Sequence, residues 1–287
     1  MHTVRTLIVA GLLLAPNSAG AEVWNRSFPA GARPSVRVTT EDAKVTVHAH
    51  AAATVDVRVE TFGSVTGLRI GKITPKVRIE QRDGRVEVHV ETEGISAGIT
   101  VSTLRFEVEI AVPAGCDLDA SIVDGSIMVT GLRGSVDVNS ADGNVMLNDL
   151  KGDVTLRTVD GSVEAKGLDG RLEGSTHDGT LRVGGRFDDL ALETHDGGMD
   201  VEVAPGSKLA NGWSLTSMDG GIRLRLPEAM KLTLDARVSD GSLDIDLDAA
   251  ALIEASELRS IRMDLNGGGP VLRIRSSDGS VKIRGGS

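Results

Sequence analysis

The residues best suited to chemistry are aspartates that recur at a fixed spacing. Each begins an Asp-Gly dipeptide 18 residues after the previous one, at Asp124, Asp142, Asp160, Asp178 and Asp196. If the intervening segments stack regularly, these carboxylates form a row with a spacing of about 5 Å. Such a row could supply weak Ca²⁺ sites, but one Asp per turn offers few of the about 6–8 oxygens that Ca²⁺ takes. The Gly-Gly-x-Gly-x-Asp nonapeptide of calcium-binding β-rolls is also missing. We therefore expect each Asp to cap its own turn, and no bound calcium.

Two histidines accompany this row. The tetrapeptide Thr-His-Asp-Gly occurs twice, one repeat apart, with its imidazoles at His177 and His195. Stacked beside two carboxylates, this pair could bind Zn²⁺ or another transition metal. Exposed histidines in a variable turn position are more often simply solvated, so we assign no metal ligand here. His48, His50 and His89 fall on the polar side of alternating strands and are assigned no role.

The sequence carries no motif for catalysis. It has no Ser-His-Asp spacing, no phosphate-binding loop and no His-Glu-x-x-His helix. Polysaccharide lyases and hydrolases do occur on parallel β-helices, but their carboxylates or Arg/Lys bases lie in grooves that long loops build. Here the turns between repeats are minimal. We predict no catalytic, cofactor-binding or metal-binding residues.

The residues between the Asp-Gly dipeptides follow the same period. Apolar and polar residues alternate, which is typical of strands with one face inward, and each repeat holds two strands and two turns. The columns that recur include Ile127, Val145, Val163, Leu181 and Met199; Leu132, Leu150 and Leu168; and the small polar Ser140, Thr158, Thr176 and Thr194. This pattern predicts an all-β, single-domain parallel β-solenoid, or β-helix, with 18-residue two-strand coils. An antiparallel meander or sandwich could also use Asp-Gly turns, but it does not require columns that repeat in every second strand.

The turns themselves suggest a backbone conformation. Both turns of each repeat centre on residues that accept a positive φ angle with little strain. We therefore expect Gly161 in a left-handed conformation.

The repeat becomes irregular toward both ends. Residues 36–47 look like a coil with Ala43 in place of the glycine, and 82–90 resemble another coil. Long alternating strands accompany them at 54–60, 76–80 and 104–112. We therefore predict irregular coils with strand excursions over 22–112, which cap a regular solenoid over 113–287 within one continuous domain. Segments 204–213 and 248–260 interrupt the register, and the second is a candidate for a short helix.

The N-terminus predicts export. Arg5 precedes a short apolar run, and Ala19-Gly20-Ala21 has the small-x-small pattern of a cleavage site, so residues 1–21 read as a signal peptide. The apolar run is shorter than the roughly 20 residues needed to span a bilayer; a buried N-terminal helix is the alternative interpretation. We expect a periplasmic or extracellular protein without membrane insertion of the mature chain.

Composition narrows the partners. Residues 22–287 contain 30 basic and 41 acidic side chains, a net charge of −11, which argues against nucleic acid or anionic lipid. Aromatic residues make up only 2% of the chain, Tyr is absent, and Trp24 and Trp213 are the sole tryptophans. A conventional aromatic carbohydrate cleft is therefore hard to build. Cys116 is alone, so no internal disulfide is possible.

The repeated Ser/Thr-x-Asp-Gly-Ser-Val-x-Val coils resemble a bacterial family of β-strand-repeat domains named "putative adhesin", whose function is unknown. The segments Gly-Gly-Pro-Val-Leu-Arg-Ile at 268–274 and Ser-Asp-Gly-Ser-Val-Lys-Ile at 277–283 are similar to the way such domains end. The resemblance covers roughly residues 36–284 and implies a β-solenoid and export. It supplies no catalytic residues.

Together these features suggest a non-catalytic envelope or surface binding or scaffold protein. Its partner would be a cell-surface protein or polysaccharide. A carbohydrate-active β-helix enzyme, either a polysaccharide lyase or a hydrolase, is the alternative.

Overall fold

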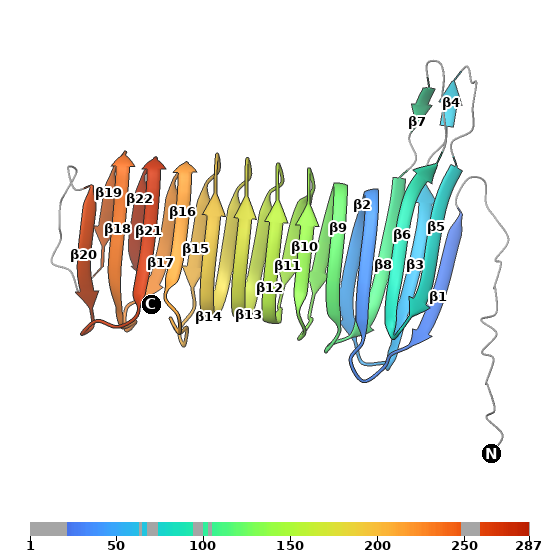
Figure 1. Cartoon of the computed structure of the whole chain (residues 1–287), viewed down its shortest axis with the longest axis horizontal. Coiled ribbons are helices and arrows are strands. Elements are labelled where there is room, and N and C mark those ends of the chain that lie inside the picture. The colour runs from blue at the N-terminus through green and yellow to red at the C-terminus, as the bar shows by residue number, and fades with distance from the viewer. Residues whose placement is uncertain are drawn as a thin grey trace.

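The computed structural model describes residues 22–62, 65–67, 74–93, 100–102, 105–247 and 259–286. Within these residues the chain consists of strands and turns, without a helix. The strands stack as coils along the long axis of the molecule (Figure 1). The predicted signal peptide lies outside the described residues, as does nearly all of the predicted helix at 248–260, so both stay predictions.

Each regular coil contributes one strand before its Asp-Gly turn and one strand after it. We call the layer of strands before the turns the first sheet and the layer after them the second sheet. The first sheet includes β10 (Val136–Ser140), β12 (Lys151–Thr158), β16 (Trp213–Asp219), β18 (Leu232–Asp240) and β21 (Val271–Asp278). The second includes β11 (Asn144–Asn148), β15 (Met199–Val203), β17 (Ile222–Pro227), β19 (Leu243–Asp246) and β22 (Val281–Gly286). Four longer strands pass from one sheet to the other: β2 (Ser35–His50), β9 (Asp117–Thr130), β13 (Val163–Thr176) and β14 (Leu181–Thr194).

The strands of the regular coils pair in parallel, one repeat apart. Val136 faces Val154 in the first sheet, and Val145 faces Val163 in the second. Because a meander would make each such neighbour antiparallel, this register confirms the predicted parallel β-solenoid.

The columns found in the sequence form the core between the two sheets. Leu132, Leu150 and Leu168 are all buried, as are the four Ser and Thr residues that precede the Asp-Gly turns. Two of these hydroxyls bond within their own turns. Ser140 Oγ accepts a hydrogen bond from the backbone N–H of Gly143 at 3.1 Å, and Thr194 Oγ1 donates to the carbonyl of Gly197 at 3.0 Å. Thr176 Oγ1 instead donates to the carbonyl of Val159 in the preceding coil, and Thr158 Oγ1 has no hydrogen-bond partner among the described residues.

The glycines of the Asp-Gly turns are required mostly for close stacking, whereas glycines of the other turn, such as Gly131 and Gly167, have positive φ angles. Gly125 does have a positive φ of 120°. Gly161 does not, so the predicted left-handed conformation is wrong at this position. A Cβ atom on Gly161 would instead overlap the carbonyl oxygen of Gly143 in the neighbouring coil. The glycines therefore allow the backbones of successive coils to approach closely at the turn.

The N-terminal end combines one regular coil with antiparallel strands. As predicted, β2 is a full coil: both of its halves pair in parallel with β9, and Ala43 faces Gly125. The prediction of a further coil at 82–90 is wrong. Asp83-Gly84 instead closes an antiparallel hairpin between β5 (Thr74–Arg82) and β6 (Arg85–Glu93), with φ angles of 49° and 83°. Two positive φ angles are the signature of the tight hairpin turn that Asp-Gly favours.

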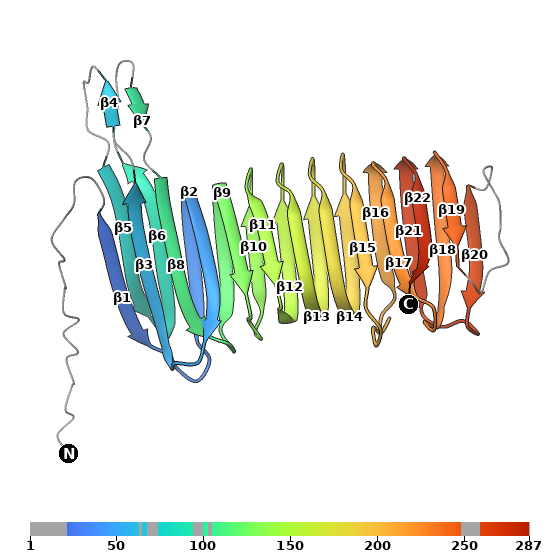
Figure 2. The same ribbon diagram turned by 180° about the vertical axis from the view of Figure 1, so that it is seen from behind.

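The remaining N-terminal strands continue the second sheet. The strands β1 (Val23–Pro29), β3 (Thr54–Phe62) and β8 (Arg105–Pro113) are antiparallel neighbours in that order, and β8 then pairs in parallel with β2. A small antiparallel pair, β4 (Val65–Gly67) and β7 (Thr100–Ser102), projects from this end of the molecule (Figure 2).

At the C-terminal end the coils are not stacked in chain order. The strands β21 and β22 lie between β16 and β18 in the first sheet and between β17 and β19 in the second. The outermost strand of the first sheet is β20 (Ser260–Leu265), which pairs antiparallel with β18. The last coil of the chain is thus inserted between two earlier ones.

Candidate functional site

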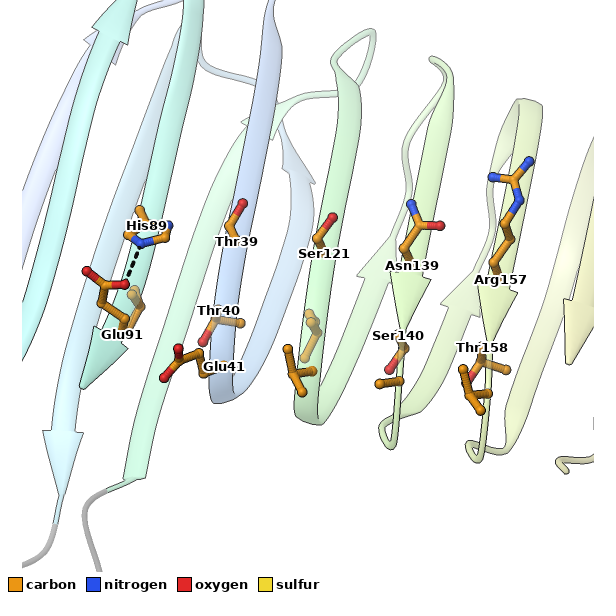
Figure 3. A pocket seen from close by; sticks show the side chains of 15 residues that line it. Thr39, Thr40, Glu41, His89, Glu91, Ser121, Asn139, Ser140, Arg157 and Thr158 are labelled. Carbon is orange, nitrogen blue, oxygen red and sulfur yellow. Dashed lines mark ion pairs between the residues drawn. The ribbon is translucent and has the colours of Figure 1, made fainter. Parts of the chain in front are cut away.

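A shallow trough with a volume of about 540 Å³ crosses the first sheet. It crosses five neighbouring strands in the order β6, β2, β9, β10 and β12 (Figure 3). Three consecutive residues from each strand line it: 89–91, 39–41, 121–123, 139–141 and 157–159. With strands about 4.8 Å apart, the trough is roughly 20 Å long and runs parallel to the solenoid axis.

One side of the trough is a row of outward polar side chains. Thr39, Ser121, Asn139 and Arg157 face one another from strand to strand. The amide of Asn139 donates to Asp137 Oδ1 at 3.0 Å, which orients it within the row. Hydroxyl, amide and guanidinium groups together can donate and accept hydrogen bonds, so this row can recognise a ligand rich in hydroxyl groups.

The other side is an apolar rim at the tips of the Asp-Gly turns that lie within β9 and follow β10 and β12, whereas β2 and β6 carry Glu41 and Glu91 there. Val123 is 52% exposed and Val159 is 50% exposed, with Ala141 between them. The coils are joined here through the backbone: the N–H of Asp142 donates to the carbonyl of Val123 at 2.8 Å, and the N–H of Asp160 donates to that of Ala141 at 2.9 Å. The rim is therefore fixed, and its exposed aliphatic side chains offer contact surface to a partner.

A charged cluster closes the N-terminal end of the trough. His89 Nε2 lies 3.1 Å from Glu91 Oε2, and Lys76 Nζ lies 2.7 Å from Glu91 Oε1. The hydrogen bonds from Lys76 and then from His89 lower the pKa of Glu91. Glu91 is therefore a hydrogen-bond acceptor at this end and a poor proton donor.

The structure places the predicted histidine pair on the same edge, beyond the trough. The rings of His177 and His195 stack at 4.4 Å with an interplanar angle of 5°. Their Nδ1 atoms lie 2.7 Å from Asp178 Oδ1 and 2.9 Å from Asp196 Oδ1. The hydrogen bond and charge of Asp178 raise the pKa of His177. Each imidazole is thus held by the carboxylate that follows it, and the described residues contain no group of three or more side chains arranged to hold a metal.

The structure differs from the expectation that each Asp carboxylate caps its own turn. Two of the turns are held by the Ser140 and Thr194 hydroxyls, and the backbone N–H groups of the aspartates continue the ladder between coils. The N–H of Asp178, for example, donates to the carbonyl of Val159 at 2.8 Å. The carboxylates of Asp178 and Asp196 hold the histidines instead.

Sequence reasoning missed the trough. The usable signal was at the residue before each Asp-Gly, where alternation predicts a solvated polar side chain but Val123 and Val159 occur. An apolar residue repeated at an outward position indicates either an interface or a groove.

Comparison with known proteins gives the following relations. The chain is similar to the crystal structure of a "putative adhesin" from Parabacteroides merdae, with 10% identity, a TM-score of 0.42 and coverage of 93% of this chain and 97% of the other. A "putative adhesin" from Bacteroides fragilis has 11% identity and a TM-score of 0.40, with coverage of 92% of this chain and 97% of the other. A "putative cell adhesion protein" from Clostridium sporogenes has 11% identity and a TM-score of 0.30, with coverage of 93% of this chain and 100% of the other.

No curated protein matches the chain. Within the described residues, no helix is long and apolar enough to cross a membrane. The family model described as Toastrack DUF4097 matches residues 35–284, from the coil of β2 to the last strand, β22. Since this match spans most of the chain, the protein belongs to the Toastrack DUF4097 family.

Proposed function

We propose that the protein is an exported, non-catalytic envelope or surface protein that binds a cell-surface polysaccharide along the trough, in the manner of an adhesin. The observation that carries this proposal is a polar row over five strands that is paired with an apolar rim over three of them, β9, β10 and β12. An extended glycan presents both hydroxyl groups and apolar ring faces. Its length would lie along the solenoid axis, and successive coils would offer it similar contacts.

The pairing of the strands favours a glycan over an extended peptide. Peptides commonly bind sheets by adding a strand to a free edge. The strands β2, β9, β10 and β12 under the trough each have a neighbour on both sides. Recognition in the trough must therefore come from side chains, as in the row from Thr39 to Arg157.

The electrostatics favour binding over glycoside cleavage. Cleavage needs a carboxylic acid whose pKa is raised enough to protonate the leaving group. Among the described carboxyl groups, every resolved displacement of the pKa is downward, and in each case a hydrogen bond from a cationic side chain is the largest cause. Glu91, the carboxyl at the end of the trough, is one of these.

Export remains part of the proposal and rests on the pattern of residues 1–21. Fractionation of cells that produce the full chain, followed by N-terminal sequencing, tests it directly. We expect the protein in the periplasm or medium, beginning at Glu22. Full-length protein that is retained in the cytoplasm would contradict export.

The binding proposal is tested by filling the trough. Asn139→Trp places an indole in the polar row, whereas Asn148→Trp places one on the opposite sheet of the same coil. Both asparagines are half-buried and outward-facing, so the variants are matched in their structural cost. The assay measures binding to immobilised, purified capsular and O-chain polysaccharides.

We expect the wild-type protein to bind at least one polysaccharide. Asn139→Trp should weaken this binding by at least about tenfold, which corresponds to 1.4 kcal/mol, and Asn148→Trp should not. Failure of the wild-type protein to bind across the panel would refute the proposal, as would equal binding by the two variants. Release of new reducing or unsaturated ends from a bound polysaccharide would instead establish the enzyme.

A further inference from the structure

The outward face of the second sheet carries charges that alternate from coil to coil. In one row, Glu164 on β13 faces Arg182 on β14, which faces Asp200 on β15, which faces Arg223 on β17. Opposite charges on neighbouring strands attract, and like charges directly opposite repel. This row is therefore arranged to stabilise the stack.

Among the second-sheet strands from β13 to β19, the alternation breaks where the last coil is inserted. On β22, Lys282 faces Arg223 and Arg284 faces Arg225. These four side chains form a compact group on two neighbouring strands, which we call the cation square. Its sides are about 4.8 Å between strands and about 6.6 Å along each strand. In the second sheet between β13 and β19, the other charged neighbours across the strands are of opposite sign, so the square is an exception among these strands.

Acidic residues flank the square but pair with only half of it. Arg225 lies 3.6 Å from Glu202. Arg284 lies 2.7 Å from Asp244 and 3.6 Å from Asp246. Among the described residues, Arg223 and Lys282 have no ion-pair partner within 4.0 Å, and both side chains are exposed. Asp200 and Asp244 face these two residues on the outer strands without closing an ion pair, so the edge from Arg223 to Lys282 keeps its hydrogen-bond donors available.

The surroundings oppose an anion less at this end of the molecule than in the middle. Residues 105–211 hold 9 basic and 20 acidic side chains, whereas residues 212–287 hold 10 basic and 11 acidic ones. The charge therefore changes along the solenoid from strongly negative to nearly neutral, so small anions are repelled less at the C-terminal end.

We propose that this edge of the cation square binds a tetrahedral oxyanion, a phosphate or sulfate group. An anion bound between Arg223 and Lys282 offsets their mutual repulsion, because it attracts both side chains. The planar guanidinium can donate two parallel hydrogen bonds to two of its oxygens, and the lysine ammonium can donate to a third. The ligand is either the free ion or an ester group on a polymer. This site lies on the sheet opposite the trough and is independent of the function proposed above.

The test compares thermal melting in chloride, sulfate and phosphate at equal ionic strength. A ligand that binds the folded state raises the melting temperature as its concentration passes the dissociation constant. We expect phosphate and sulfate to raise it by roughly 2 °C or more relative to chloride. The double variant Arg223→Gln/Lys282→Gln should lose this shift. Arg182→Gln, which removes a single cation between two acids in the same row, should keep it.

Stability in chloride gives a second readout. The double variant should melt close to the wild-type temperature there, because it removes one like-charge contact together with the attractions of Arg223 to Asp200 and of Lys282 to Asp244. If the double variant does not fold, Lys282→Gln alone serves, with at least half of the phosphate shift lost. Inorganic polyphosphate distinguishes a polymer ligand from the free ion. Binding that is tighter per phosphate than that of the free ion indicates a polymer ligand, whereas equal binding indicates the free ion. An absent oxyanion shift in the wild-type protein, or one that survives Arg223→Gln/Lys282→Gln, would overturn the proposal.

Discussion

Gly161 offers the sharpest test of how the coils stack. A Cβ atom built on it overlaps the carbonyl oxygen of Gly143 and lies 2.9 Å from the carbonyl carbon of the same residue and 2.8 Å from Thr158 Oγ1. The first two neighbours are backbone atoms of the adjacent coil, which the ladder hydrogen bonds hold in place. The overlap can therefore be relieved only if the two coils separate locally. Overpacking of this kind costs about 1–3 kcal/mol and occasionally more, and we place Gly161→Ala at about 3 kcal/mol.

The measurement is the melting temperature of the variant against wild type. For a domain of this size about 1 kcal/mol corresponds to roughly 2–4 °C, so Gly161→Ala should lower the melting temperature by roughly 6–12 °C. The matched control is Gly115→Ala, since a Cβ there has nothing within 4 Å and its φ is not positive. That change should be neutral or slightly stabilising because alanine restricts the unfolded chain.

A third variant separates close stacking from backbone strain. Asparagine tolerates the left-handed conformation better than alanine does. If Gly161 were needed for a positive φ, Gly161→Asn would be milder than Gly161→Ala. Close stacking predicts that the bulkier asparagine is at least as costly. The reasoning is refuted if Gly161→Ala melts within about 2 °C of wild type, or if Gly161→Asn is clearly the more stable of the two.

Three further outcomes are expected. Leu150→Asp should lower the melting temperature by more than roughly 8 °C, because Leu150 is 2% exposed and the carboxylate would be buried without a partner. Calcium should leave the melting temperature unchanged in both the wild-type protein and Asp160→Asn. Zn²⁺ should have a marginal effect that disappears in His177→Ala. A Ca²⁺ shift in the wild-type protein that is lost in Asp160→Asn would show a calcium site. Asp235→Asn should destabilise the protein by about 1–3 kcal/mol at pH 7, because a hydrogen bond from Arg275 lowers the pKa of the buried carboxyl. A depressed pKa contributes stability above about pH 4 and loses it as the pH falls through the folded value, so urea titrations of the two proteins should converge in acid.

The content of a coil could be predicted from the sequence, whereas the role of an individual dipeptide could not. Stacking places the same environment at the same position of every coil, so the recurrence of Leu132, Leu150 and Leu168 indicates a shared buried position. Asp83-Gly84 carries the same two residues as the coil turns yet closes a hairpin. The difference lies two residues earlier, where Gln81 stands in place of the Ser or Thr that precedes most coil turns. This signal is weak, because Ile122 occupies that place before a genuine coil turn.

The trough could not be predicted because it depends on the course of the strands. Its polar residues, such as Ser121 and Asn139, have the composition of any solvated strand face. Only the arrangement of strand and turn in space makes that face concave. The cation square was hidden for a related reason. In chain order the charges of Arg223, Asp244 and Lys282 alternate, and the like-charge contact arises only because their strands stack in a different order.

The inserted coil follows from how the edges of β18 are filled. A strand in a sheet has two edges, and β20 occupies the outer edge of β18 as an antiparallel neighbour. The chain then reverses through Asn266, Gly267 and Gly268, all with positive φ, and the next strand, β21, must run parallel to β18. The outer edge is already taken, so β21 can pair only with the inner edge, between β18 and β16. The strand β22 follows it into the second sheet between β19 and β17. The antiparallel cap that protects the end of the first sheet thus determines where the last coil lies and brings Lys282 beside Arg223.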